Sequence, residues 1–230
     1  MDGPLDTRVT VRSAAATHTA DCVVFGYAEG ELRVLLVRRA VEPFLGHWVL
    51  PGGAMAETER LEETARRVLL ELVGVRNLYL QQVATYSAPD RHPVRRVVTT
   101  SYYALVRPEQ HQPTALGYLS EVRWFPLSEV PPLGFDHSTL LADAHARLIL
   151  HLRTRPLAFD LLPERFTLTE AQGVYEEILG EGLDRRNFRR KLQTYDFLIE
   201  TEEKRRGVRG GPVLYRVHVD RLRAQLQKNT

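Results

Sequence analysis

The sequence predicts an α/β domain over residues 1–158, followed by a smaller winged helix-turn-helix domain over residues 159–230. In the first part, runs of β-branched residues alternate with two patterns of amphipathic helix. In the second part, two short helix patterns precede a strand, an arginine-rich loop and another strand, which is the element order of a winged helix. The two parts meet in a segment that contains two prolines (153–169), and we place the domain boundary near residue 158.

The composition is that of an ordinary globular protein. Of the 230 residues, 43% are hydrophobic and 26% are charged, which excludes the disordered, collagen-like and disulfide-scaffold classes. The single cysteine, Cys22, cannot form an internal disulfide, so a reducing compartment is expected. There is no apolar run of roughly 20 residues, the length of a membrane span, and the first residues lack a signal-peptide pattern. We therefore expect a cytoplasmic protein with no membrane partner.

Strand and helix signals follow one another along the first domain. The expected strands cover 19–27, 32–39, 77–87, 96–107 and 121–127, with turns at 28–31 and 88–94 and a break in the chain at 51–53. The first helix presents an apolar face made by Leu61, Ala65, Val68, Leu69 and Leu72, and it stops before Gly74. A second, long amphipathic helix is expected over 137–153. This order predicts a sheet with helices packed on it.

The second domain opens with two capped helices. Thr169 is the expected N-cap of a helix over 170–179 that ends at Gly180, and Asp184 that of a helix over 185–195. A strand near 197–200, a basic loop over 203–211, a strand over 213–218 and a short C-terminal helix complete the expected order.

The segment GAMAETERLEETARRVLLELVGV (53–75) resembles the Nudix box, G-x5-E-x7-R-E-U-x-E-E-x-G-U, where U is a bulky aliphatic residue. The matching positions are Gly53, Glu59, Arg67, Leu69, Glu71, Gly74 and Val75, and the sequence LPGG leads into the box. The resemblance covers roughly the first 155 residues. It implies a Nudix-like α/β/α sandwich with a ligand pocket.

Two departures from the box bear on catalysis. Val68 and Leu72 stand where the family has glutamates, so Glu71 is the single carboxylate among positions spaced i, i+3 and i+4. A Mg²⁺ ion prefers several oxygen ligands, and the metal would polarise a pyrophosphate and activate water. We therefore expect no metal, no cofactor and no catalytic residues. The pocket is expected to bind a small-molecule effector, with candidate ligand-binding residues Arg38, Arg39, Gly52, Gly53, Arg67 and Glu71.

The basic residues of the second domain form two patches. On a helical wheel, Phe188, Leu192 and Tyr195 share one face, whereas Arg186 and Arg190 lie opposite. Guanidinium groups suit phosphates and guanine edges, and an amide suits adenine. A second patch in the loop between the last two strands has the position of a wing. The candidate DNA-binding residues are Arg185, Arg186, Asn187, Arg189, Arg190, Lys191, Arg205, Arg206 and Arg209.

The stretch from Phe159 to Thr201 also resembles the C-terminal domain of Nudix-related transcriptional regulators, whose best-known branch is the NrtR family. The resemblance implies a repressor of NAD metabolism genes that senses ADP-ribose or a similar nucleotide-sugar. One alternative is a related branch that regulates pentose or other sugar genes. Another is a hydrolase of ADP-ribose or related nucleoside diphosphate derivatives; an RNA-binding protein is disfavoured because no stacking platform is evident. We expect a homodimer on a palindromic operator in double-stranded DNA.

Overall fold

The computed structural model describes residues 15–75, 79–111, 113–115, 117–205 and 211–228. The strands are β1 (Thr17–Ala28), β2 (Glu31–Arg39), β3 (Trp48–Val49), β4 (Gly52–Ala54), β5 (Leu80–Tyr86), β6 (Val97–Val106), β7 (Leu119–Pro126), β8 (Leu198–Lys204) and β9 (Val213–Val217). The α-helices are α1 (Leu61–Val73), α2 (His137–Thr154), α3 (Leu168–Leu179), α4 (Arg185–Leu192) and α5 (Val219–Lys228). Short 3₁₀ turns are η1 (Pro108–Gln110), η2 (Leu127–Glu129) and η3 (Leu157–Leu161). None of these helices is both long and apolar enough to cross a bilayer.

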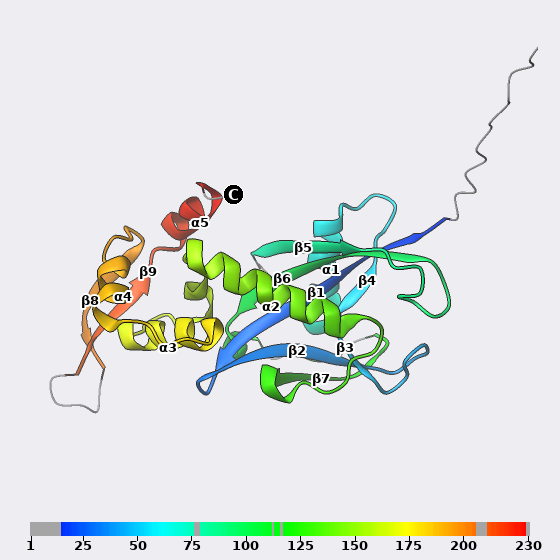
Figure 1. The fold of residues 1–230 in the computed structure, drawn as a ribbon, viewed down its shortest axis with the longest axis horizontal. Coiled ribbons are helices and arrows are strands. Elements are labelled where there is room, and N and C mark those ends of the chain that lie inside the picture. Colours follow the sequence, from blue (N-terminus) through cyan, green and yellow to red (C-terminus); the bar gives the residue numbers. More distant parts are fainter. Residues whose placement is uncertain (1–14, 76–78, 112, 116, 206–210, 229–230) are drawn as a thin grey trace, which may run out of the picture.

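The first domain is a mixed sheet between two helices (Figure 1). The main strand order is β3-β2-β1-β6-β5, with β4 also paired to β1 and β7 to β2. Strands β1 and β6 run parallel, whereas the other pairs are antiparallel. Successive residues of β1 face opposite sides, so Cys22 and Val24 join the core under α1 while Val23 and Phe25 join the core under α2. The predicted α/β/α sandwich is confirmed.

The second domain has the predicted order of two helices, a strand pair and a final helix. Strands β8 and β9 are antiparallel, and Phe166 forms a bridge to Tyr215 that ties the start of the domain to β9. Its buried residues belong to the same hydrophobic cluster as the α2 face of the sheet, which runs from Val23 on β1 to Leu226 on α5. Residue 158, the proposed boundary, lies within η3 in the middle of this cluster. The winged helix therefore packs directly on the sandwich.

Three local predictions were wrong. The N-cap of α3 is Thr167, not Thr169, because Thr167 and Glu170 form a reciprocal capping box. Helix α4 ends at Leu192, three residues before Tyr195, as the chain turns to bury Phe197 completely; Tyr195 still reaches the core by stacking on Phe197. The expected break at 51–53 overlaps β4, in which Gly52 and Gly53 pair with residues of β1.

Candidate functional site

A cavity of about 780 Å³ opens at the edge of the sheet. Its walls come from β1, the end of β2 and its following loop, the β3–β4 segment, the loop before β6, and the start of α2. Among its lining residues are Thr19, Asp21, Arg39, Leu50, Gly52, Gly53, Ala54, Arg91, His92, Arg95, Tyr118, Phe135 and His137. Its size lies in the range of sites that enclose most of a nucleotide-sized ligand.

A buried polar network forms the floor of this cavity. Asp21, which is 6% exposed, accepts a hydrogen bond of 2.7 Å at Oδ2 from the hydroxyl of Thr99, and Arg91 lies 3.6 Å from the same oxygen. The Arg91 guanidinium donates twice to Asp136, at 2.9 and 2.8 Å, so its orientation is fixed by a bidentate pair. His137 accepts a 2.9 Å hydrogen bond at Nδ1 from the Leu50 amide, and burial lowers its pKa. Buried polar side chains whose hydrogen bonds are satisfied in this way are held in one arrangement.

Aromatic and cationic groups form another part of the wall. The Tyr118 hydroxyl donates a 2.6 Å hydrogen bond to the carbonyl of Gly52, and His92 stacks on Phe135 at 5.3 Å. The Arg39 guanidinium lies over both the Tyr118 and Phe135 rings, at 5.6 and 5.3 Å. It also donates to the carbonyls of Pro43 and Glu42, so it holds the adjoining loop in place. A planar base and an anionic group would both find partners on this wall.

The structure places the predicted ligand-binding residues in two groups. Arg39, Gly52 and Gly53 line the cavity. Arg38 is outside its lining, bonded to the Gly46 carbonyl and 3.7 Å from Glu121. Arg67 and Glu71 are also outside the lining, on α1.

Sequence reasoning missed the floor of the cavity and most of its aromatic wall. The residues concerned are Asp21, Arg91, Tyr118, Phe135, Asp136 and His137. One signal was available: Asp21 is an acidic residue inside an otherwise apolar strand, a position where a carboxylate is buried only with partners.

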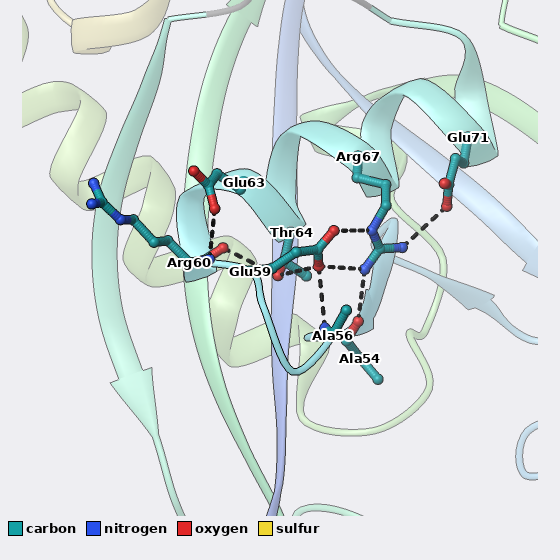
Figure 2. A network of polar contacts seen from close by, with 8 residues as sticks. All are labelled: Ala54, Ala56, Glu59, Arg60, Glu63, Thr64, Arg67 and Glu71. Carbon is teal, nitrogen blue, oxygen red and sulfur yellow. Dashed lines mark hydrogen bonds and ion pairs between the residues drawn. The ribbon is translucent and has the colours of Figure 1, made fainter.

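Arg67 links α1 to the loop before it (Figure 2). Its guanidinium donates to Glu59 at 2.5 and 2.9 Å, to Glu71 at 3.1 Å, and to the carbonyl of Ala54 at 2.9 Å. Glu59 also accepts from the Ala56 amide and the Thr64 hydroxyl, which closes the loop onto the helix. Arg67 thus holds this loop against α1 through two carboxylates and one carbonyl.

The side chains at positions 68, 71 and 72 of α1 differ in their surroundings. Val68 and Leu72 are 2% and 9% exposed and pack in the core beneath α1, whereas Glu71 is exposed and engaged by Arg67. The Val68 side chain is also close to the cavity wall, since a Cβ on Gly53 would fall 2.8 Å from it. Within the described residues, no three His, Cys, Asp or Glu side chains are grouped so that they could hold a metal ion.

The Glu59–Arg67 pair predicts a pH-dependent stability. The hydrogen bonds from Arg67 are the largest of the effects that lower the pKa of Glu59 from its ordinary 4.5 to about 2. Because the pKa of Glu59 is lower in the folded chain than in the unfolded chain, the pair stabilises the fold above pH 4.5. This stabilisation is lost as the pH falls towards 2. We expect the Glu59→Gln variant to lose less unfolding free energy than wild type over this interval. Urea titrations at pH 5, 4 and 3 measure the unfolding free energy of both proteins. If the two free energies fell in parallel with pH, the Glu59–Arg67 pair would not contribute to the pH dependence of stability.

Helix α4 presents an exposed cationic surface. Asp184 caps the helix by accepting from the Asn187 amide, as predicted, and Phe188 and Leu192 anchor its other face in the core. Arg185, Arg186, Asn187, Arg190 and Lys191 are exposed, while Arg189 is half-buried. Asn187 accepts a 2.9 Å hydrogen bond from Arg190, which orients that guanidinium.

The cations of α4 differ from the other arginines in their partners. Across the described chain, nine arginines form ion pairs with carboxylates, and none of them lies on α4. Cations without carboxylate partners are free to neutralise phosphates and release counterions. The exposed face of α4 therefore has the charge and the geometry of a recognition helix.

The wing is attached to the rest of the domain by two ion pairs. Arg205, at the end of β8, pairs with Glu170 on α3, and Glu203 pairs with Arg165. Arg205 is thus engaged within the domain. Arg206 and Arg209 lie outside the described residues.

Comparison with known families matches both domains. Residues 17–146 match the model of the NUDIX domain, and residues 158–217 match that of the NrtR DNA-binding winged helix domain.

Relatives match the two domains in the same order. The chain is 35% identical over 202 residues to the "ADPR responsive transcriptional repressor NtrR" of Acinetobacter baylyi, covering 86% of this chain and 80% of that protein. The crystal structure of Shewanella oneidensis NrtR complexed with a 27mer DNA is 37% identical, with a TM-score of 0.80, over 89% of this chain and 95% of that one. The cocrystal structure of the NUDIX domain of Shewanella oneidensis NrtR with ADP ribose is 39% identical, with a TM-score of 0.55, over 59% of this chain and 90% of that one. The chain therefore belongs to the NrtR family of Nudix-related transcriptional regulators.

Proposed function

We propose that this protein is a DNA-binding transcriptional repressor that responds to ADP-ribose. The observation that carries the proposal is the exposed face of α4, whose cations have no carboxylate partner among the described residues. The same chain also contains a cavity large enough for a nucleotide-sized ligand. A relative named as an ADPR-responsive repressor, and related structures with DNA and with ADP ribose, support the same assignment. Because ADP-ribose is a fragment of NAD, we propose that the target genes belong to NAD metabolism. We place the protein itself in the bacterial cytoplasm.

The chemistry of the cavity favours a nucleotide-sugar over a simple pentose. The rings of Tyr118, Phe135 and His92 offer surfaces for a base, and Arg39 and Arg95 bring positive charge for a diphosphate. A neutral pentose has neither a base nor a charge for these groups. The cavity therefore favours ADP-ribose over a pentose as the effector.

The hydrolase alternative is disfavoured by the packing of α1. The two positions that differ from the Nudix box are filled by aliphatic side chains in the core, and Glu71 is occupied by Arg67. A pyrophosphatase would need carboxylates there to hold its metal.

We further propose that the chain acts as a homodimer on a palindromic operator. One winged helix contacts a short half-site, so two copies related by a two-fold axis would supply specificity. The ligand then acts by favouring one arrangement of the two winged helices over the other, which requires different affinities for the two arrangements.

The test uses a DNA duplex that the purified full chain selects from a random pool. Binding is followed by fluorescence anisotropy in the presence of Mg²⁺ and increasing ADP-ribose. We expect ADP-ribose to weaken duplex binding roughly tenfold or more, within the usual range of allosteric coupling. The effect should persist for hours without AMP accumulating, because the ligand is not consumed.

Parallel titrations with ADP and with free pentoses serve as controls. If a pentose released the duplex and ADP-ribose did not, the sugar-sensing alternative would replace the proposal. If AMP accumulated while DNA binding recovered, the protein would be a metal-dependent hydrolase. Light scattering of the DNA complex that gave one chain per duplex would exclude the dimer.

A further inference from the structure

Two polar atoms on side chains that line the cavity have no hydrogen-bond partner among the described residues. They are Oδ1 of Asp21 and Nε2 of His137, which lie 3.8 Å apart, beyond hydrogen-bond distance. Both side chains line the cavity, and the two residues are only 6% and 5% exposed. The other polar atoms of these side chains are occupied, Oδ2 by Thr99 and Nδ1 by Leu50. Because both residues line the cavity, these two atoms are available to a ligand that enters it.

The hydrogen-bond partners decide which of the two atoms donates. The Leu50 amide donates to Nδ1 of His137, which must therefore be unprotonated. A neutral imidazole then carries its proton on Nε2, and burial, which lowers the pKa of His137, favours the neutral ring. The floor of the cavity thus presents one acceptor, the carboxylate oxygen of Asp21, beside one donor, the N–H of His137.

We propose that this pair recognises a hydroxyl group of the ligand's terminal ribose. A hydroxyl oxygen both donates and accepts, and atoms 3.8 Å apart can both reach one oxygen at about 2.8 Å. A phosphate carries no proton for Asp21 and would be repelled by its charge, and an ammonium group has no lone pair for His137. The inference rests on the proposed function, since it assigns one end of ADP-ribose to the cavity floor.

Gly52 leaves room for the Asp21 carboxylate beside the backbone of β4. A Cβ at this position would fall 1.8 Å from Oδ1 of Asp21, so any side chain there would displace the carboxylate. The Gly52 carbonyl is in turn held by the Tyr118 hydroxyl, which fixes the backbone next to the pair. The position of the Asp21 carboxylate on the cavity floor therefore depends on a glycine at this position.

The experiment compares ADP-ribose with ADP, which lacks the terminal ribose, by calorimetry on the full chain. Wild type should bind ADP-ribose more tightly than ADP by roughly tenfold to a hundredfold, the range expected for a hydrogen bond to a charged group. Asp21→Asn should reduce this preference to near unity and leave the affinity for ADP unchanged. His137→Asn should have a similar effect, because the amide oxygen can still accept from Leu50 while the Nε2 donor is lost.

Tyr103→Phe is the matched control. It removes the buried 2.7 Å hydrogen bond to His151 on the α2 side of the sheet, away from the residues that line the cavity, so it tests for a general loss of stability. Its preference for ADP-ribose should equal that of wild type. Equal losses of ADP and ADP-ribose binding in Asp21→Asn would instead place the adenine on the floor and overturn the inference. A wild-type chain that binds neither ligand would remove the proposed function, and this inference with it.

Discussion

Replacing Arg186 and Arg190 together with alanine is expected to abolish the discrimination between the selected duplex and random DNA. Both side chains are exposed on the α4 face opposite buried Phe188, and neither has a carboxylate partner among the described residues. A bidentate arginine–guanine contact contributes about 1–3 kcal/mol of discrimination, so the double variant should lose about 2–6 kcal/mol. Anisotropy titrations of both duplexes over a range of salt concentrations measure the loss. Binding of ADP-ribose should be unchanged.

Arg205→Ala provides the matched control on the wing. If Arg205, a candidate DNA-binding residue, contacts a phosphate, its loss lowers both affinities and reduces the salt slope by about one. The ion pair with Glu170 gives a competing role, in which Arg205 holds the wing and its loss leaves the slope nearly unchanged. In either case, the ratio of the affinities for the selected duplex and for random DNA should equal that of wild type. If the α4 double variant kept the wild-type ratio, α4 would not be the recognition helix.

Replacing Phe159 with alanine is expected to destabilise the whole chain. Phe159 is 1% exposed in η3, and its ring lies 5.2–6.4 Å from those of Phe166, Tyr175, Tyr195 and Phe197. Removing a buried aromatic ring costs about 3–5 kcal/mol, which should lower the melting temperature by roughly 6–20 °C for a chain of this size. Because the surrounding cluster is continuous with the α2 side of the sheet, we expect the loss in one transition. Scanning calorimetry measures it.

Leu150→Ala is a suitable control for that measurement. Leu150 is also apolar but 56% exposed on α2, so its truncation should change the melting temperature only slightly. Two separate transitions in Phe159→Ala, with that of the sandwich unmoved, would mean that the domains unfold independently.

The sequence predicted most elements because their signals are local. The periodicity of α1 and α2, the Asp184 cap and the alternation along β1 each depend on a few neighbouring residues, and tertiary contacts agree with them. The end of α4 was missed because burial of Phe197 overrides a helix signal that continues to residue 195. Local propensity is a weak prior in such places.

The cavity floor could not be predicted in the same way. Asp21, Arg91 and His137 lie on three segments that are far apart in the sequence and meet only when β1, the loop before β6 and α2 have packed. The position of Glu71 outside the cavity lining could not be predicted for a related reason. Spacing alone places Val68 and Glu71 near each other on α1, but the boundary between core and solvent passes between them.

Helix α2 spans the distance between the two binding surfaces. Its first residue, His137, lies in the cavity floor, while Leu148 and Leu152 belong to the core shared with the winged helix, and Arg153 forms an ion pair with Glu181 just after α3. Its 18 residues extend about 27 Å. Linkage is reciprocal, so if ADP-ribose weakens operator binding as proposed, the operator must weaken ADP-ribose binding by the same factor. Under the proposed function, a chain bound to its operator would therefore bind ADP-ribose more weakly and respond only at higher ligand concentrations than the free protein.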